Sequence, residues 1–296
     1  MSSQQSTVLF DALGPRGRKR VAIMSVISAV VILGALGYAT FYLGQKDFFS
    51  GAAWANVFDA LVVQKIWIPA LLSTIKAAVF GMIGAVVLGV IIGMGRVSRF
   101  KTLRAITAVY VQFFRALPVL LLMWIPYTVN LFLGFLDPIM SKGNSSLFFV
   151  AAGLTIYNAA ILAEILRSGI NALPPGQAMA GHAVGLRHGQ VMRSVVMPQA
   201  VRNMLPAVLA QMVILLKDTA LGYTIAYPEL LHEAQTLGKT YDAYLQMLVT
   251  GAAGYFLLAF ALSQLVKYLD RRMSRKTAAK KTVAAEIDPA GGMINT

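Results

Sequence analysis

Long apolar runs, each followed by a short polar segment, constrain this chain more than any other feature of its sequence. A transmembrane helix needs about 20 mostly apolar residues to cross the hydrocarbon of a bilayer. Runs of about that length or more lie at Val21–Gly44, Ile66–Gly95, Ile106–Leu136, Leu147–Leu166, Met204–Tyr227 and Ala243–Val266. The sequence therefore predicts an all-α integral membrane protein with about six transmembrane helices.

Composition agrees with this fold class. The chain is 57% hydrophobic and only 13% charged, and its mean hydropathy is +0.67. A soluble domain is roughly a quarter charged, so too little polar material is present here to cover a soluble core. The absence of cysteine excludes disulfide frameworks, thiolate metal sites and cysteine nucleophiles.

Two of the runs need comment. The first follows a basic N-terminal tail, residues 1–20, and is too long for the apolar core of a signal peptide, so we expect a retained helix at 21–44. The segment 45–65 is expected outside, at the interface. The third run is too long for one straight crossing and is interrupted by Arg115, Pro118 and Pro126, so part of it should lie along the inner surface.

Basic residues predict the orientation. With the N-terminus inside, 19 of the 26 lysines and arginines fall in inner segments and 4 in outer segments. This bias places both termini in the cytoplasm by the positive-inside rule. It also accounts for the net charge of +14 without nucleic acid. The basic tail 267–296 is expected to be disordered.

No catalytic, metal or cofactor site is expected. The chain has three histidines, His182, His188 and His232. None of them belongs to a metal-ligand pattern such as H-E-x-x-H. Gly238-Lys239-Thr240 looks like the end of a phosphate loop, but Glu233 stands where the first glycine of that motif belongs. We find no Ser/His/Asp set that could make a nucleophile.

Five charged residues lie within spans or at their margins, namely Lys76, Arg115, Glu164, Lys217 and Asp218. An ion in hydrocarbon is costly, so such groups face partners or a wet path. Lys217 and Asp218 have apolar sequence on both sides, which favours a polar lining. The other three either line the same path or lie near the interface and extend to it.

The inner loop 171–200 has the most specific pattern. Leu173-Pro174-Pro175-Gly176 stops the preceding helix, and Gln177–Val184 can form two helical turns that Gly185 ends in the αL conformation. Arg187–Met197 can form a second short helix. The sequence thus predicts a helix, a glycine turn and a helix projecting into the cytoplasm, against the alternative of an ordinary surface loop.

This loop resembles the signature of binding-protein-dependent ABC importer permeases, which is Glu-Ala-Ala, three residues, Gly, nine residues and Ile-x-Leu-Pro. Here it reads Met179-Ala180-Gly181, Gly185 and Val195-Val196-Met197-Pro198 at the same spacing. Four flanking segments resemble sequences of the polar amino-acid uptake subfamily, namely Arg167–Gln177, Pro198–Asn203, Leu215–Thr219 and Pro228–Leu231. The resemblance covers roughly Ile68–Val266. Met179 departs from it, because the family has a glutamate there.

The resemblance implies a type I importer fold in a bacterial cell membrane, with a transmembrane domain over 66–266 and a cytoplasmic coupling loop over 167–203. It implies that this chain does no chemistry, that a separate ABC ATPase hydrolyses ATP, and that a second permease (identical or paralogous) and an extracytoplasmic substrate-binding protein complete the system. The substrate would be a polar or charged amino acid such as glutamate, glutamine, arginine or histidine. Residues implied to couple to the ATPase are Met179, Ala180, Gly181, Gly185, Val195, Met197 and Pro198.

The alternative is a secondary transporter, or another membrane-embedded protein without an ATPase partner. Such a transporter should show ion-coupling acids in paired broken helices. Only Glu164 and Asp218 are candidates for that role.

Overall fold

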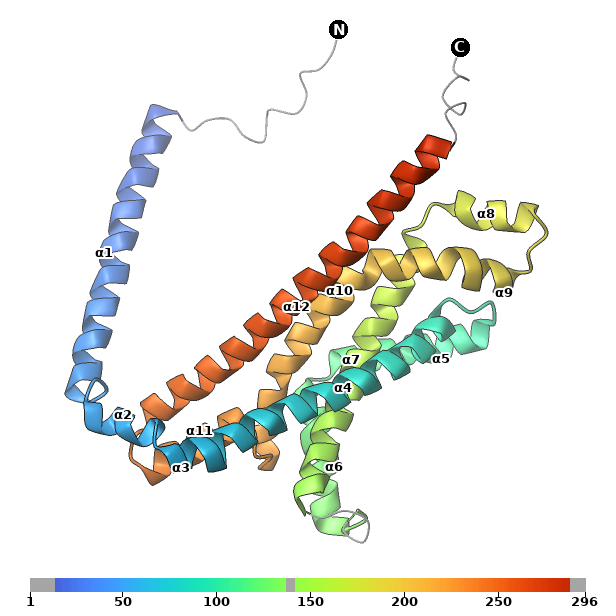
Figure 1. Ribbon diagram of the computed structural model, residues 1–296. Helices are drawn as coiled ribbons and strands as arrows, with labels where there is room; N and C mark the ends of the chain where they lie inside the picture. The colour runs from blue at the N-terminus through green and yellow to red at the C-terminus, as the bar shows by residue number, and fades with distance from the viewer. Residues whose placement is uncertain (1–13, 137–141, 288–296) are drawn as a thin grey trace. The chain divides into compact units, whose positions relative to one another are not determined.

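The computed structural model describes residues 14–136 and 142–287, and within those ranges the secondary structure is helical without a strand (Figure 1). The chain divides into two compact units, Met1–Asn56 and Val57–Thr296. Each unit is described by itself below. The expected outer loop 137–146 falls partly outside the described residues, and the following helix begins at Lys142.

The first unit consists mainly of one long helix, α1 (Pro15–Gln45). Pro15 occupies its first turn, where a missing N–H costs nothing. None of the residues of α1 is buried within the protein, as expected of a helix whose apolar surface is covered by lipid. Its 31 residues rise about 46 Å, more than the roughly 30 Å of hydrocarbon. The short helix α2 (Gly51–Val57) follows it in sequence.

The second unit is built on two helices in close contact, α4 (Ile68–Arg96) and α7 (Lys142–Asn171). A short segment, α3 (Ala60–Val62) and the π-helix η2 (Val63–Trp67), leads into α4. A Cβ added to Gly89 would lie 2.9 Å from the Leu162 Cβ, and one added to Gly93 would lie 2.7 Å from the Leu166 Cδ2. Glycines therefore allow these backbones to approach closely, as small residues do between helices in lipid.

The third apolar run forms two helices, α5 (Lys101–Ala116) and α6 (Val119–Leu133), bent by 92°. Pro118 causes the break, because it cannot continue a helix, and Leu117 before it is held in an extended conformation. This bend explains why the run exceeds the length of one crossing. That α5 lies along the inner membrane surface stays a prediction.

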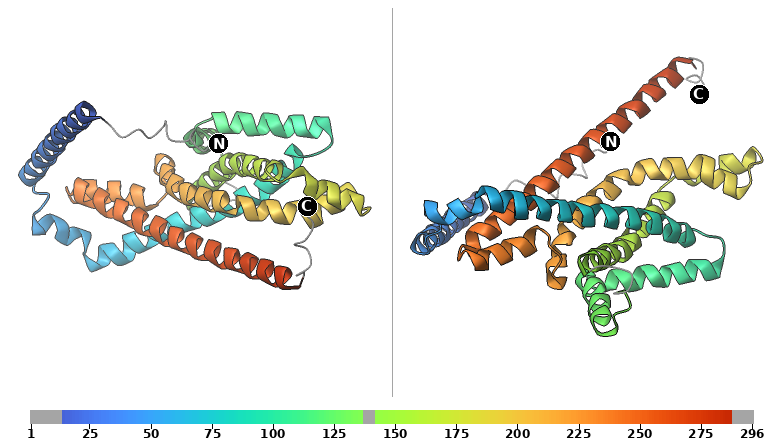
Figure 2. Two further views of the ribbon diagram at one scale, coloured as in Figure 1. Left: turned by 90° about the horizontal axis from the view of Figure 1, so that it is seen from above. Right: turned by 60° about the horizontal axis from the view of Figure 1, so that its bottom comes forward.

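The last part of the unit contains α10 (Met197–Asp218), the 3₁₀ segment η4 (Thr219–Ile225), α11 (Leu230–Thr240) and α12 (Tyr244–Ile287). α12 packs against α11 and α10, and Figure 2 shows α10 and α12 from two further sides. Residues 228–242 were expected to be a polar loop, yet most of them form α11. Its buried Leu230, Ala234 and Leu237 share one face at helical spacing.

The C-terminal tail also differs from expectation. α12 continues to Ile287, where the sequence predicted disorder from residue 267. Residues 267–287 are rich in alanine, lysine and arginine, which have high helix propensity, and they extend a helix that has already begun.

Within the described residues, five helices are long and apolar enough to cross a membrane, and the bent pair α5–α6 adds a sixth. The five cover Pro15–Gln45, Trp54–Arg96, Ser145–Asn171, His188–Ile225 and Tyr244–Tyr268. The predicted all-α membrane fold with about six spans is confirmed.

Candidate translocation path and coupling loop

The inner loop folds as two short helices at the end of the second unit where α7 ends (Figures 1 and 2). They are α8 (Pro175–Ala183) and α9 (His188–Val191), and α9 continues through the π-helix η3 (Met192–Val196) into α10. Pro174 precedes α8 and Pro175 occupies its first turn. The loop is therefore a helix, a turn and a helix, as the sequence predicts, and the second helix is continuous with a span.

Gly185 makes the turn. Its φ is +81°, the left-handed region that residues with a Cβ rarely adopt. The Gly185 N–H donates to the His182 carbonyl at 3.0 Å, and the Leu186 N–H donates to the Gly181 carbonyl at 3.2 Å. These two bonds form a Schellman motif, which satisfies the carbonyls at the end of α8.

Gly181 holds α8 against the following helix. It is buried, and a Cβ at this position would lie 2.9 Å from the Val191 Cγ2. The Gln199 amide also donates to the Gln177 side chain at 3.1 Å, which joins α8 to the first turn of α10. These two contacts join α8 to the helix that continues into α10.

The remaining residues of the predicted coupling set lie on both helices. Met179 and Ala180 are exposed on α8, and Met179 is 62% exposed. Val195 and Met197 are half-buried on η3 and at the start of α10, and Pro198 is exposed. The outer face of α8 thus offers Met179 and Ala180 to another protein, and Gly185 and Pro198 are exposed as well.

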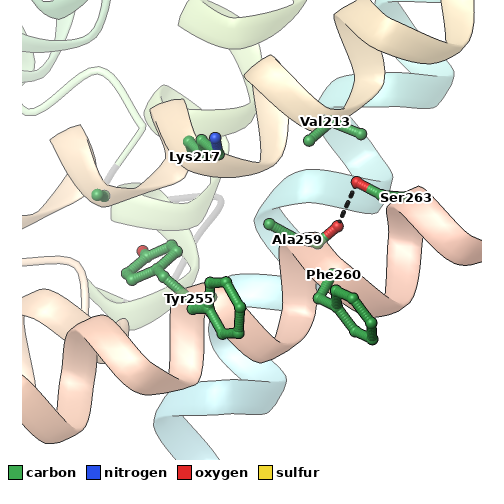
Figure 3. Close-up of a pocket in the computed structure, with 8 residues that line it drawn as sticks. Val213, Lys217, Tyr255, Ala259, Phe260 and Ser263 are labelled. Carbon is green, nitrogen blue, oxygen red and sulfur yellow. Dashed lines mark hydrogen bonds between the residues drawn. The ribbon is translucent and has the colours of Figure 1, made fainter.

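Lys217 and Asp218 end α10, where the chain tightens into η4. Lys217 is exposed and lines a groove of about 480 Å³ between α10 and α12, while Asp218 is half-buried. Tyr255, Phe260 and Ser263 line the groove from α12 (Figure 3). Neither Lys217 nor Asp218 has an ion-pair partner among the described residues. The groove lining includes Lys217 but not Asp218, so the role of the pair as a polar lining stays a prediction.

Glu164 has a different environment from Lys217 and Asp218. Its Oε2 atom accepts a hydrogen bond from Arg96 Nη2 at 3.2 Å. Its Oε1 atom accepts from Arg167 Nη2 at 2.6 Å and from Arg167 Nε at 3.0 Å. It therefore links α7 to the last turn of α4. η4 contacts α7 at Val150, 14 residues earlier and about 21 Å away along the helix. The structure does not bring Glu164 together with Lys217 and Asp218.

Lys76 and Arg115 are exposed, on α4 and at the end of α5. Neither forms an ion pair with a described residue. Exposure without a partner agrees with side chains that extend to the interface, and equally with a path between two copies of the chain.

A buried amide pair escaped the sequence analysis. The Gln211 amide on α10 donates to the Asn158 carbonyl oxygen on α7 at 2.8 Å, and the Asn158 amide donates to the Leu154 carbonyl at 2.9 Å. Asn158 is fully buried. Asn158 and Gln211 carry no charge, so the charged residues within spans do not point to them. Their position as polar residues within apolar runs is the signal that would have found them.

A second polar cluster surrounds Glu229, which is fully buried before α11. Its oxygens accept from the backbone N–H groups of Leu231 and His232, both at 2.8 Å, and from the Tyr255 hydroxyl on α12. Burial raises the pKa of Glu229 to about 7, although these hydrogen bonds oppose that shift. Glu229 belongs to the segment Pro228–Leu231, whose role as a helix cap no local pattern revealed.

About six candidate spans, polar side chains buried between helices of the second unit and an exposed two-helix loop built on Gly185 are the features of a membrane transport subunit. The match to a family model makes the assignment specific. The chain belongs to the family described as binding-protein-dependent transport system inner membrane component, whose model matches residues 85–275. The predicted resemblance is confirmed.

Curated relatives are similar over most of the chain. The glutamate transport system permease protein GluD of Corynebacterium glutamicum is 38% identical over 242 residues, which cover 80% of this chain and 87% of that protein. The glutamate/aspartate import permease protein GltK of Escherichia coli O157:H7 is 29% identical, with 74% and 97% covered. The probable glutamine ABC transporter permease protein GlnP of Bacillus subtilis is 34% identical, with 69% and 91% covered.

Solved structures agree. A crystal structure of an amino acid ABC transporter with histidines matches with a TM-score of 0.63 and 27% identity, covering 71% of this chain and 94% of that one. The MetNI methionine ABC transporter, at 20% identity and a TM-score of 0.52, is similar in fold.

Proposed function

We propose that this chain is the membrane-spanning permease of an ATP-driven importer for polar or charged amino acids of the glutamate and glutamine class. The α8–Gly185–α9 loop carries the proposal, because it has the spacing of the family signature and is built as a rigid, exposed element. The named functions of GluD, GltK and GlnP support the substrate class.

Coupling would run through α8. Met179 and Ala180 present its exposed face to an ATPase subunit, while Gly181 and Gln177 hold α8 to η3 and α10. ATP-driven closure of two ATPase subunits would displace α8, and the continuous η3–α10 helix would carry that displacement to Lys217 and Asp218. This is a rigid-body movement, so no residue of this chain needs to react chemically.

The path would be lined first by Lys217 and Asp218. Their charges suit the carboxylate and ammonium groups of an amino acid, and Lys217 lines the groove between α10 and α12. Glu164 is a weaker candidate because Arg96 and Arg167 already bind it. Lys76 and Arg115 remain weaker candidates as well.

The proposed assembly contains this chain, a second permease subunit, two ABC ATPase subunits inside and a substrate-binding protein outside. Both termini lie in the cytoplasm of a bacterial cell, in line with the distribution of basic residues. ATP hydrolysis belongs to the ATPase subunits, and membrane lipid surrounds the whole.

Reconstitution tests this function. The chain is purified with its co-expressed ATPase and second permease, placed in liposomes and supplied with binding protein and labelled glutamate, glutamine, arginine or histidine. We expect uptake that requires ATP and binding protein. Uptake by this chain without an ATPase, driven by an ion gradient, would contradict the proposal and support a secondary transporter.

A further inference from the structure

A groove of about 820 Å³ lies where α4, α5 and the α9–η3 helix meet. Its wall is mostly apolar and includes Ile91, Met94, Phe100, Leu103 and Met197. Ile91 is 62% exposed and Phe100 is 76% exposed. The groove therefore opens an apolar surface to its surroundings, which in a membrane protein include lipid.

Basic side chains accompany that surface. Arg99 and Arg193 line the groove and are exposed, and His188 lines it between them in sequence. Arg99 and His188 thus come from different elements to the wall of one groove. The lining contains no carboxylate, and neither arginine pairs with an acid in the described part of the chain. The groove thus combines apolar contact area with uncompensated positive charge.

The groove lies at the end of the unit that carries the coupling loop, because His188 and Gly189 belong to α9. The basic-residue bias places that end on the cytoplasmic side. The cytoplasmic leaflet contains anionic lipids, and basic pockets between spans on this side suit their headgroups. The complementary ligand has a phosphate for the arginines and acyl chains for the apolar wall.

We propose that this groove is a binding site for an anionic phospholipid of the inner leaflet, with its headgroup at Arg99 and Arg193 and its acyl chains along Ile91 and Met94. The bound lipid would contact both α4 and η3. It would therefore lie beside the contacts that join α8 to η3 and α10. The proposal does not depend on which substrate the chain transports.

Fluorescence quenching by brominated lipids tests the site. The full chain contains no cysteine, so Met94→Cys gives a single attachment point for a fluorophore in the groove. Leu257→Cys, at a 63% exposed position on α12 outside the lining, reports ordinary lipid contact. Each labelled protein is reconstituted with and without its ATPase subunits in nanodiscs containing brominated phosphatidylglycerol or brominated phosphatidylcholine.

We expect phosphatidylglycerol to be preferred at position 94 by roughly 25-fold at low ionic strength, since each arginine adds about fivefold, and no preference at position 257. Arg99→Gln with Arg193→Gln should abolish the preference. The control pair Arg202→Gln and Lys267→Gln removes two exposed charges outside the groove and should retain it. Unchanged quenching at position 257 verifies that each variant is folded.

Three results would overturn the proposal. Equal quenching by both lipids at position 94 in the unsubstituted background would show that the arginines select no headgroup. A preference that survives the loss of both arginines would place the selectivity elsewhere. Loss of lipid quenching at position 94 when the ATPase subunits bind would show that the groove is part of the ATPase interface.

Discussion

Replacing Gly185 with valine should uncouple this transporter without disturbing its membrane fold. The φ of +81° at Gly185 is unfavourable for a β-branched residue, and such backbone strain costs about 1–3 kcal/mol. A Cβ at Gly185 would meet nothing within 4 Å, so the cost comes from backbone conformation and not from a clash. One to two kcal/mol shifts the ratio of native to non-native turns about 5- to 30-fold towards the non-native ones.

Gly189→Val is the matched control. Gly189 lies in α9, has an ordinary φ and also has open space around its Cβ position. Gly185→Asn is the second control, because asparagine tolerates the left-handed region better than valine. Met179→Ala should have a smaller effect than Gly185→Val, since it removes only an exposed apolar contact.

The assay measures ATPase co-purification and the stimulation of ATP hydrolysis by loaded binding protein. We expect Gly185→Val to insert into the membrane normally but to lose most of that stimulation, while Gly189→Val and Gly185→Asn keep most of it. If Gly185→Val and Gly189→Val behave alike and support full uptake, the loop is not the coupling element and the reasoning from φ is refuted.

Three other predictions follow from the same structure. Replacing Lys217 or Asp218 with alanine should reduce uptake several-fold while leaving assembly with the partner subunits intact, and normal uptake by the double variant would exclude them from the path. Single cysteines at the exposed positions 236, 239 and 240 should react with an impermeant maleimide from outside and those at the exposed positions 182–184 only from inside, so outside labelling in the second segment would invert the topology. Burial raises the pKa of Glu229 from 4.5 to about 7, so the folded state holds its proton more tightly than the unfolded state does. The resulting stabilisation is complete below pH 4.5 and is lost as the pH rises through 7, and it amounts to about 3 kcal/mol. The melting temperature should therefore fall between pH 5 and pH 8, and Glu229→Gln should flatten that dependence; an equally steep fall in the variant would assign it to another group.

Spans and the coupling loop could be predicted because both depend on local sequence. The length of an apolar run decides whether it can cross a bilayer, and the break at Leu117 follows from Pro118 beside it. Gly185 is recognisable as a turn because it directly follows Gln177–Val184, which can form two helical turns, and glycine readily ends a helix in the αL conformation. Such features need no knowledge of what lies across the fold.

The buried polar clusters could not be predicted in the same way. Glu229 caps α11 while accepting a hydrogen bond from Tyr255, 26 residues further along the chain. Asn158 and Gln211 meet across 53 residues. Sequence indicates that such groups need partners, but only the fold decides which partner each one finds. The same holds for Glu164, whose two arginines turn a candidate path residue into a link between helices.

The contact between α4 and α7 restricts how this permease can open. Gly89 and Gly93 seat the two backbones against each other, and the Arg96–Glu164 ion pair joins them at the end of α4. Sliding or separating this pair would expose glycine surfaces that no other side chain fills and would break the ion pair between Arg96 and Glu164. Opening that keeps the contact between α4 and α7 intact is therefore the less costly kind, and it leaves α10 and α12 as the helices expected to move.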